Sequence, residues 1–98
     1  MIKSFRHKGV QAFFETGSRA GIQPSHAKRL QILLTTLNVA NSAEDMSAPG
    51  WKLHKLSGIN PKGQRVQDHW AVSVNGSWRL IFMFEDQHAV LVDYMDYH

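Results

Sequence analysis

The dipeptide Asn75-Gly76 limits what this chain can fold into more than any other short segment, because strand-forming residues flank it on both sides. Residues 69–74 and 77–84 are rich in β-branched and aromatic side chains, which favour strands. Asn-Gly is the strongest short-range signal for a two-residue hairpin turn, since both residues tolerate the positive φ angles that such a turn needs. The sequence therefore predicts an antiparallel hairpin in its C-terminal half.

A turn at this dipeptide also sets the register of the hairpin. It predicts that Trp78 lies opposite Ser73, and that Arg79 lies opposite Val72. One face would then carry Trp70, Val72, Val74 and Ile81, and the other would carry Ala71, Trp78, Leu80, Phe82 and Phe84. Both faces are largely apolar, which indicates two central strands rather than edge strands.

Arg79 is the polar exception on the first, mainly aliphatic face. A guanidinium is costly to remove from water unless a carboxylate or a phosphate partners it. An arginine fork also matches the oxygens of a phosphate in a bidentate way. Two interpretations stay open at this point. Arg79 either forms an internal ion pair with Asp93 or Asp96, or it forms a phosphate-binding site.

The N-terminal half of the chain predicts a short strand and two helices. Residues 2–5 alternate in polarity as a strand does, and residues 10–15 present one apolar helical face. Pro24 suits the first turn of a longer helix. Its apolar positions recur at spacings of three and four, at Ala27, Leu30, Leu34 and Leu37.

From Trp51 onward the apolar period changes to two. Residues 51–56 are expected to form a strand, residues 57–63 an exposed, mobile loop, and residues 89–94 a last strand. The predicted fold is thus α+β, with a short N-terminal strand and two helices packed on a twisted antiparallel sheet of about four strands.

Length and composition exclude several function classes. With 98 residues the chain is expected to be one domain, spanning residues 1–98. It has no cysteine, and its six histidines include no pair at the i, i+4 spacing, so no metal is expected. No nucleotide or dinucleotide motif occurs, and no cofactor is expected. The first residues are polar at once and no apolar run could span a membrane, which predicts a cytoplasmic protein.

Charge is unevenly distributed along the chain. All 11 Lys and Arg residues lie within residues 1–83, which carry a net charge of +7, whereas residues 84–98 carry −4. A basic body attracts polyanions, because each neutralised phosphate releases condensed counterions. The charge distribution alone is explained equally well by a generic basic surface that binds no nucleic acid.

Three stretches of the sequence resemble one known family. These are the opening Met1-Ile2-Lys3-Ser4-Phe5, the segment Trp51-Lys52-Leu53-His54-Lys55-Leu56-Ser57-Gly58, and the C-terminal third with Trp78-Arg79, Val92-Asp93-Tyr94 and Asp96-Tyr97-His98. In this order they are similar to the HigB-type, or plasmid-maintenance killer, toxins of the RelE superfamily. The resemblance covers nearly the whole chain.

The resemblance implies a RelE-like fold and a type II toxin that cuts mRNA on the ribosome. It also implies a HigA-like helix-turn-helix antitoxin, with the pair binding its own operator DNA. The matching catalytic positions are His54, Arg79, Asp96, Tyr97 and His98. Where many relatives carry a lysine, this chain has Ser57, so Lys55 or Lys62 is expected to compensate.

These positions suit metal-free cleavage of RNA by its own 2′-hydroxyl group. His54 would transfer a proton, and Arg79 would stabilise charge on the phosphate in the transition state. Tyr97 would stack on a base or hold the nucleotide, His98 would be the second proton-transfer group, and Asp96 would orient one of these cations. Contacts to RNA or the ribosome are expected from Lys3, Lys8, Arg19, Lys28, Arg29, Lys52, Lys55 and Lys62.

Two other interpretations remain. A ParE-like gyrase inhibitor would share the fold and the antitoxin but needs no proton-transfer groups, which argues against it. A non-enzymatic nucleic-acid-binding module would need only positive charge and exposed aromatic residues such as Trp51, Trp70 and Trp78. Tryptophans on the strands of a small domain more often belong to the core.

Overall fold

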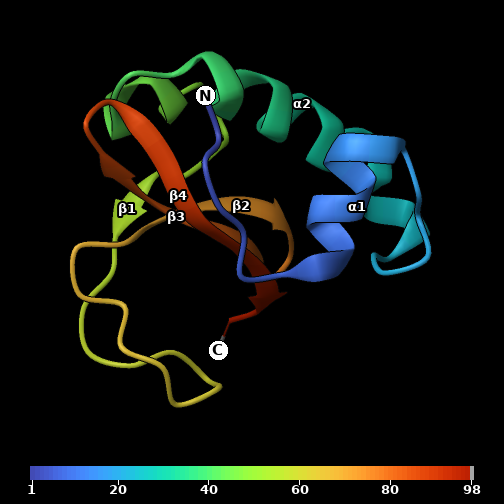
Figure 1. Ribbon diagram of the computed structural model, residues 1–98. Helices are drawn as coiled ribbons and strands as arrows, with labels where there is room; N and C mark the ends of the chain where they lie inside the picture. The colour runs from blue at the N-terminus through green and yellow to red at the C-terminus, as the bar shows by residue number, and fades with distance from the viewer. Residues whose placement is uncertain (98) are drawn as a thin grey trace.

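The structure, a computed structural model, describes residues 1–97 and confirms the α+β class (Figure 1). Its elements are α1 (Lys8–Thr16), the 3-10 turn η1 (Pro24–His26), α2 (Ala27–Val39), the 3-10 turn η2 (Ala43–Met46), β1 (His54–Lys55), β2 (Trp70–Asn75), β3 (Trp78–Glu85) and β4 (His88–Asp96). The four strands form one sheet in the order β1-β2-β3-β4, and each strand is antiparallel to its neighbours. No helix in residues 1–97 has both the length and the apolar character needed to cross a membrane.

Both predicted helices are present, and local signals explain where they begin and end. The side chain of His7 caps α1 by accepting a hydrogen bond from the backbone N–H of Val10 at 3.0 Å. Gly17 ends α1 in the left-handed region, at φ 81°. Pro24 starts the turn that leads into α2, whose core-facing residues are Ala27, Leu30, Leu33, Leu34 and Leu37.

The predicted strand at residues 2–5 is only partly formed. Ile2 and Phe5 each make an isolated parallel bridge to β4 rather than a continuous ladder. Between these bridges, Leu91 has a φ of 55° and its backbone N–H donates to the Ser4 hydroxyl at 2.9 Å. This left-handed residue lies within β4, at the point where a ladder with residues 2–5 would have to continue.

The strand predicted over residues 51–56 is also shorter than expected. Only His54 and Lys55 pair with β2, because Lys52 has a φ of 53° and leaves the extended conformation. Backbone hydrogen bonds to the region of β2 still form on either side: Ser73 N–H donates to the Trp51 carbonyl, and Leu56 N–H to the His69 carbonyl, both at 2.8 Å.

The hairpin forms, but its predicted register is wrong by one residue. The two turn residues are Gly76 and Ser77, and a bulge between Ser73 and Asn75 follows from this shift. Ser73 therefore pairs with Arg79. Trp70 and Val72 consequently share a face with Leu80 and Phe82, whereas Ala71 shares the other face with Ile81.

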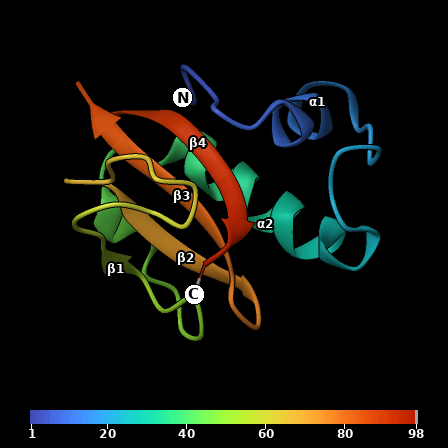
Figure 2. The same ribbon diagram turned by 90° about the horizontal axis from the view of Figure 1, so that it is seen from below.

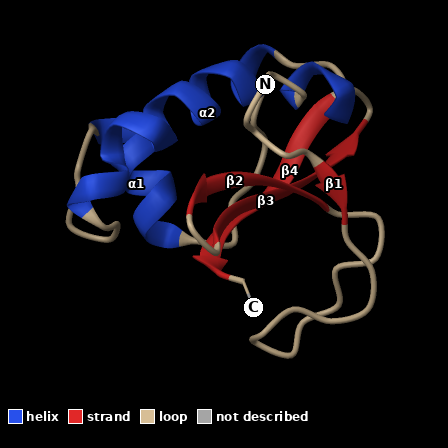
Figure 3. Ribbon diagram, turned by 180° about the vertical axis from the view of Figure 1, so that it is seen from behind, coloured by secondary structure: helices blue, strands red, loops and turns tan. Residues whose placement is uncertain are grey.

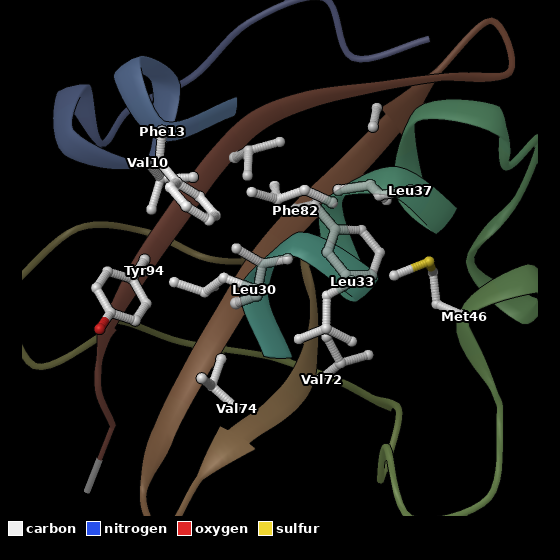
Figure 4. Close-up of a cluster of buried hydrophobic side chains, with 14 of the residues drawn as sticks. Val10, Phe13, Leu30, Leu33, Leu37, Met46, Val72, Val74, Phe82 and Tyr94 are labelled. Carbon is white, nitrogen blue, oxygen red and sulfur yellow. The ribbon is translucent and has the colours of Figure 1, made fainter. Parts of the chain in front are cut away.

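The two faces of the sheet have different covers (Figure 3). The helix-covered face packs against α1 and α2 and contains the main core, seen in Figure 4. The loop-covered face lies under residues 56–69 and contains a smaller apolar cluster, formed by Leu56, Val66, Ala71, Ile81 and Met95 with Tyr97 packed against it. Figure 2 shows this loop crossing in front of the strands.

The loop at residues 57–63 is exposed as predicted, except at Asn60, which is buried. The Asn60 side-chain oxygen accepts hydrogen bonds from the backbone N–H groups of Lys62 and Gln64, both at 2.9 Å. Its side-chain nitrogen donates to the Gln64 side-chain oxygen, also at 2.9 Å. This one side chain therefore fixes the shape of the loop tip.

Candidate active site

Pairing in the sheet brings His54 and Arg79 to the loop-covered face. His54 pairs with Ala71, which belongs to the small cluster on that face. Arg79 pairs with Ser73, two residues further along the same strand. Because residues two apart on a strand point to the same side, both predicted catalytic side chains occupy one surface of the sheet.

His54 is exposed, and a local contact orients its ring. Its Nδ1 lies 2.9 Å from the backbone carbonyl oxygen of Lys52. Since a carbonyl can only accept, Nδ1 carries the proton in the neutral ring, and Nε2 keeps its lone pair. The contact with the Lys52 carbonyl therefore leaves the Nε2 of His54 as the ring nitrogen that can accept a proton, and no hydrogen-bond partner from the described part of the chain occupies it.

Arg79 is half-buried and directs one arm of its guanidinium to the hairpin turn. Its Nη1 donates to the carbonyl oxygens of Gly76 at 2.6 Å and Trp78 at 3.0 Å. Within residues 1–97, its Nε and Nη2 have no hydrogen-bond partner, and no ion pair joins it to Asp93. The Asp93 carboxylate instead accepts a hydrogen bond from the Tyr94 backbone N–H at 2.9 Å. Two donors of Arg79 are thus available to an anion.

Ser77 holds the C-terminal part of the predicted site. Its hydroxyl donates to the Asp96 carboxylate, and its carbonyl accepts a hydrogen bond from the Tyr97 backbone N–H at 2.8 Å. Asp96 pairs with Trp78 and so alternates away from the side of Arg79, whereas Tyr97 packs on the loop-covered face. The predicted residue His98 lies outside the described residues. Sequence reasoning missed Ser77, because its role depends on the shifted turn.

The predicted RNA-binding cations differ in their contacts. Lys55 pairs with Asp68 at 3.4 Å and lies 5.9 Å from the centre of the Trp70 ring. Arg29 joins α2 to the sheet, since its Nε and Nη2 donate to the Ser73 carbonyl at 3.3 and 3.2 Å. The remaining cations are exposed and come from separate segments: Lys3, Lys8, Arg19, Lys28, Lys52 and Lys62.

A cleft of about 490 Å³ lies at the end of the sheet where β3 begins and β4 ends. Two predicted residues, Lys62 and Asp96, line it. Its walls also contain Trp78, which the sequence indicated only as a stacking residue of a non-enzymatic binding module, and His7 and Tyr94, which it did not indicate as functional. The cleft brings together residues from the N-terminal segment, the loop tip and two strands, so no local pattern could have revealed it.

The aromatic residues of the cleft are tightly packed. The Trp78 and Tyr94 ring centres lie 4.8 Å apart, and His7 meets Tyr94 edge-on at 5.3 Å. The Tyr94 hydroxyl lies 2.7 Å from Nδ1 of His26 and accepts a hydrogen bond from the Gln23 backbone N–H at 3.3 Å. This network fixes the cleft wall next to α2.

Burial changes the titration of two of these groups. It lowers the pKa of His7 below 6.5, and nearby Lys62 lowers it further, while Asp93 partly opposes both effects. The ring of His7 is therefore neutral at pH 7, and because its Nδ1 accepts from Val10, its Nε2 carries the proton. Burial raises the pKa of Tyr94, so its hydroxyl stays protonated.

Comparison with known proteins gives two concordant results. Residues 3–98 match a family described as the RelE-like toxin of the type II toxin-antitoxin system HigB. The chain is also 34% identical to the endoribonuclease HigB of Proteus vulgaris, over 98 residues that cover 100% of both chains. A toxin of a type II system has an antitoxin as its partner. The chain therefore belongs to the HigB-like family of RelE-like toxins from type II toxin-antitoxin systems.

Proposed function

We propose that this toxin is an endoribonuclease that cuts mRNA on the translating ribosome, in the cytoplasm, and thereby stops translation. The observation that carries the proposal is the placement of His54 and Arg79 on one face of the sheet. The full-length similarity to an endoribonuclease supports it. A proton-transfer group and a cation on the same surface are the main requirements for RNA cleavage by transesterification.

In this reaction the 2′-hydroxyl oxygen of one nucleotide attacks the adjacent phosphorus atom. The bond between phosphorus and the 5′-oxygen of the next nucleotide breaks, which leaves a 2′,3′-cyclic phosphate and a 5′-hydroxyl. His54 accepts the proton of the 2′-hydroxyl at Nε2, because the Lys52 carbonyl holds the proton on Nδ1. The reaction requires neither a metal ion nor an organic cofactor.

Arg79 stabilises the charge that develops on the phosphate oxygens. The hairpin carbonyls hold its Nη1, which leaves Nε and Nη2 to bind two oxygens side by side. Tyr97 stacks on a nucleobase at the same face. His98 returns a proton to the leaving 5′-oxygen, and Asp96 orients the cation that does so.

Lys62 supplies the cation for which many relatives use the position of Ser57. Lys55 is less suited, because Asp68 already holds its ammonium group at 3.4 Å. Lys62 lines the same cleft as Asp96. The other cations that the sequence predicted for RNA binding contact the phosphates of ribosomal RNA.

The antitoxin is a HigA-like protein with a helix-turn-helix, and the toxin reaches operator DNA only through it. Support for this part comes from the family alone, since membership in a type II system requires an antitoxin.

The test is to induce the protein alone in a bacterium and to map RNA 5′ ends. A reporter mRNA should be cut within its translated frame. The same mRNA without its ribosome-binding site should stay intact, because no ribosome presents it. Cuts at equal rates in both messages would contradict ribosome dependence, and growth arrest with intact mRNA would favour a bound target such as gyrase.

A further inference from the structure

The cleft at the end of the sheet combines an aromatic wall with one charged residue of each sign. Trp78 and Tyr94 form the wall, Lys62 lies on the loop side, and Asp96 lies at the end of β4. Its volume of about 490 Å³ falls within the range of about 300–1,000 Å³ that is usual for small-molecule sites. None of the reaction steps assigned above uses its aromatic side chains.

We propose that this cleft binds one nucleotide of the substrate RNA, next to the phosphate that is cut, with the base against Trp78 and a phosphate on Lys62. The inference rests on the proposed endoribonuclease function and adds a subsite to it. It commits to a nucleotide within an RNA strand rather than to a free nucleotide.

The position of the cleft supports this occupant. Met95 belongs to the loop-covered face and Trp78 packs on the helix-covered face, yet both line the cleft. The cleft thus lies where the two faces meet at the end of the sheet. An RNA strand that contacts Arg79 on the loop-covered face needs only to continue past Asp96 to enter the cleft.

The side chains of the cleft suit a flat, polar-edged base with an attached anion. Trp78 is half-buried, so part of its ring remains open for stacking while Tyr94 supports it at 4.8 Å. His7 presents a protonated Nε2 and is uncharged at pH 7, so it offers a donor without a second positive charge. Lys62 then provides the exposed cation for the phosphate.

Two structural features shape the walls of the cleft. A Cβ atom on Gly21 would lie 2.5 Å from the Cα of Gly9, so only glycine allows residues 20–23 to rest on the start of α1 and form one wall. On the opposite side, the Asn60 side chain binds the backbone N–H of Lys62 and fixes the loop tip. The cleft is therefore built by the fold rather than by the exposed side chains alone.

The first experiment follows the indole N–H signals of Trp51, Trp70 and Trp78 by nitrogen-15 NMR in the full-length protein. The probe is a 2′-O-methyl trinucleotide, which cannot be cut because its 2′-oxygens carry no proton. The Trp78 signal should move on titration, while the signal of Trp51, which is 9% exposed, stays in place. Binding of the trinucleotide with an unchanged Trp78 signal would overturn the proposal.

A matched pair of variants tests the phosphate contact. Lys62→Gln should weaken trinucleotide binding by about fivefold to tenfold and lower the salt dependence by about 0.7 in the log–log slope, as expected for one lost contact to a single strand. Arg65→Gln removes the same charge from the same exposed loop but lies outside the cleft, so it should leave binding unchanged. Equal effects of the two variants would overturn the proposal.

Two further measurements separate this inference from the proposed function. If adenosine 3′-monophosphate binds as tightly as the trinucleotide and moves Trp78 equally, the site takes a free nucleotide and the inference fails. If the wild-type protein leaves translated mRNA intact, the endoribonuclease function fails instead. A third outcome is that the wild-type protein and Lys62→Gln both cut mRNA normally and bind the trinucleotide with equal affinity. This result would exclude the subsite and leave the endoribonuclease function intact.

Discussion

The helix-covered face and the loop-covered face of the sheet are packed very differently. On the helix-covered face, Val72, Leu80 and Phe82 are fully buried against the leucines of α2. On the loop-covered face, a single loop covers a cluster of five buried residues, and His54 beside it remains exposed. The same four strands therefore have one thick cover and one thin cover (Figure 3).

This difference in packing explains why the candidate catalytic residues His54 and Arg79 lie on the loop-covered face. A guanidinium or an imidazole loses much solvation free energy in a deep core, whereas a thin cover leaves it partly hydrated and open to a substrate. Arg79 and Leu80 are neighbours in sequence, yet Leu80 is fully buried and Arg79 is only half-buried. Stability and chemistry are thus assigned to opposite faces of one strand.

The largest expected effect comes from removing a large side chain from the core of the helix-covered face. Phe82→Ala should lower the free energy of unfolding by about 3–5 kcal/mol or prevent folding, because a fully buried ring is lost. Val66→Ala, at an equally buried site within the loop, should cost only about 1.5–2 kcal/mol, since two methyl groups are lost. Urea unfolding of both variants measures the contrast, and equal losses would contradict it.

The next largest effect is expected on the rate of mRNA cutting, from a residue on the loop-covered face. His54→Gln should slow mRNA cutting by about a hundredfold, because it removes the proton-transfer group. Its melting temperature should stay close to that of the wild-type protein, since His54 is exposed. Cutting rates in a reconstituted translation reaction, measured beside thermal unfolding, check both expectations. A stable variant that cuts at the wild-type rate would remove His54 from the mechanism.

A smaller effect on the free energy of unfolding is expected from a substitution in the loop at residues 56–69. Asn60→Ala leaves the backbone N–H groups of Lys62 and Gln64 without their acceptor and should cost about 1–3 kcal/mol. Hydrogen exchange should speed up at these two amides while the amides of β3 stay protected. Matching acceleration in β3 would mean that the loop and the sheet open together.

The smallest effect is a pH dependence at the N-terminus of α1. Burial lowers the pKa of His7 below 6.5 in the folded state, so the stability it provides is present above pH 6.5 and is lost as the pH falls through the lower, folded-state value. His7→Asn keeps a capping side chain but does not titrate. The decrease in melting temperature from pH 7.5 to pH 5 should therefore be smaller in this variant than in the wild-type protein. An equal decrease would exclude His7 as a source of the pH dependence.

Local signals in the sequence were sufficient for the helices and for the existence of the hairpin. Pro24 and the spaced leucines define α2, and Asn75-Gly76 places the hairpin turn to within one residue. The exact turn could not be predicted, because the bulge at Val74 depends on which face each side chain can bury. The left-handed conformations of Lys52, beside the short strand β1, and of Leu91, within β4, could not be predicted either, because neither residue is a glycine.

The candidate site was only partly accessible from the sequence. His54 and Arg79 could be named from the family resemblance, and their common face follows from the sheet register. The cleft could not be found in this way, because it depends on long-range contacts. Gly9 touches Gly21, and Lys62 reaches a wall formed by Trp78.

The role of the loop-covered face in catalysis is tested most directly by comparing Arg79→Ala with the wild-type protein in a purified translation reaction. Thermal unfolding verifies that both proteins are folded. The variant should cut translated mRNA about 10²–10³-fold more slowly, because the charge on the phosphate is no longer stabilised. Its melting temperature should stay near that of the wild-type protein. A folded Arg79→Ala variant that cuts mRNA at the wild-type rate would contradict the assignment of catalysis to the loop-covered face.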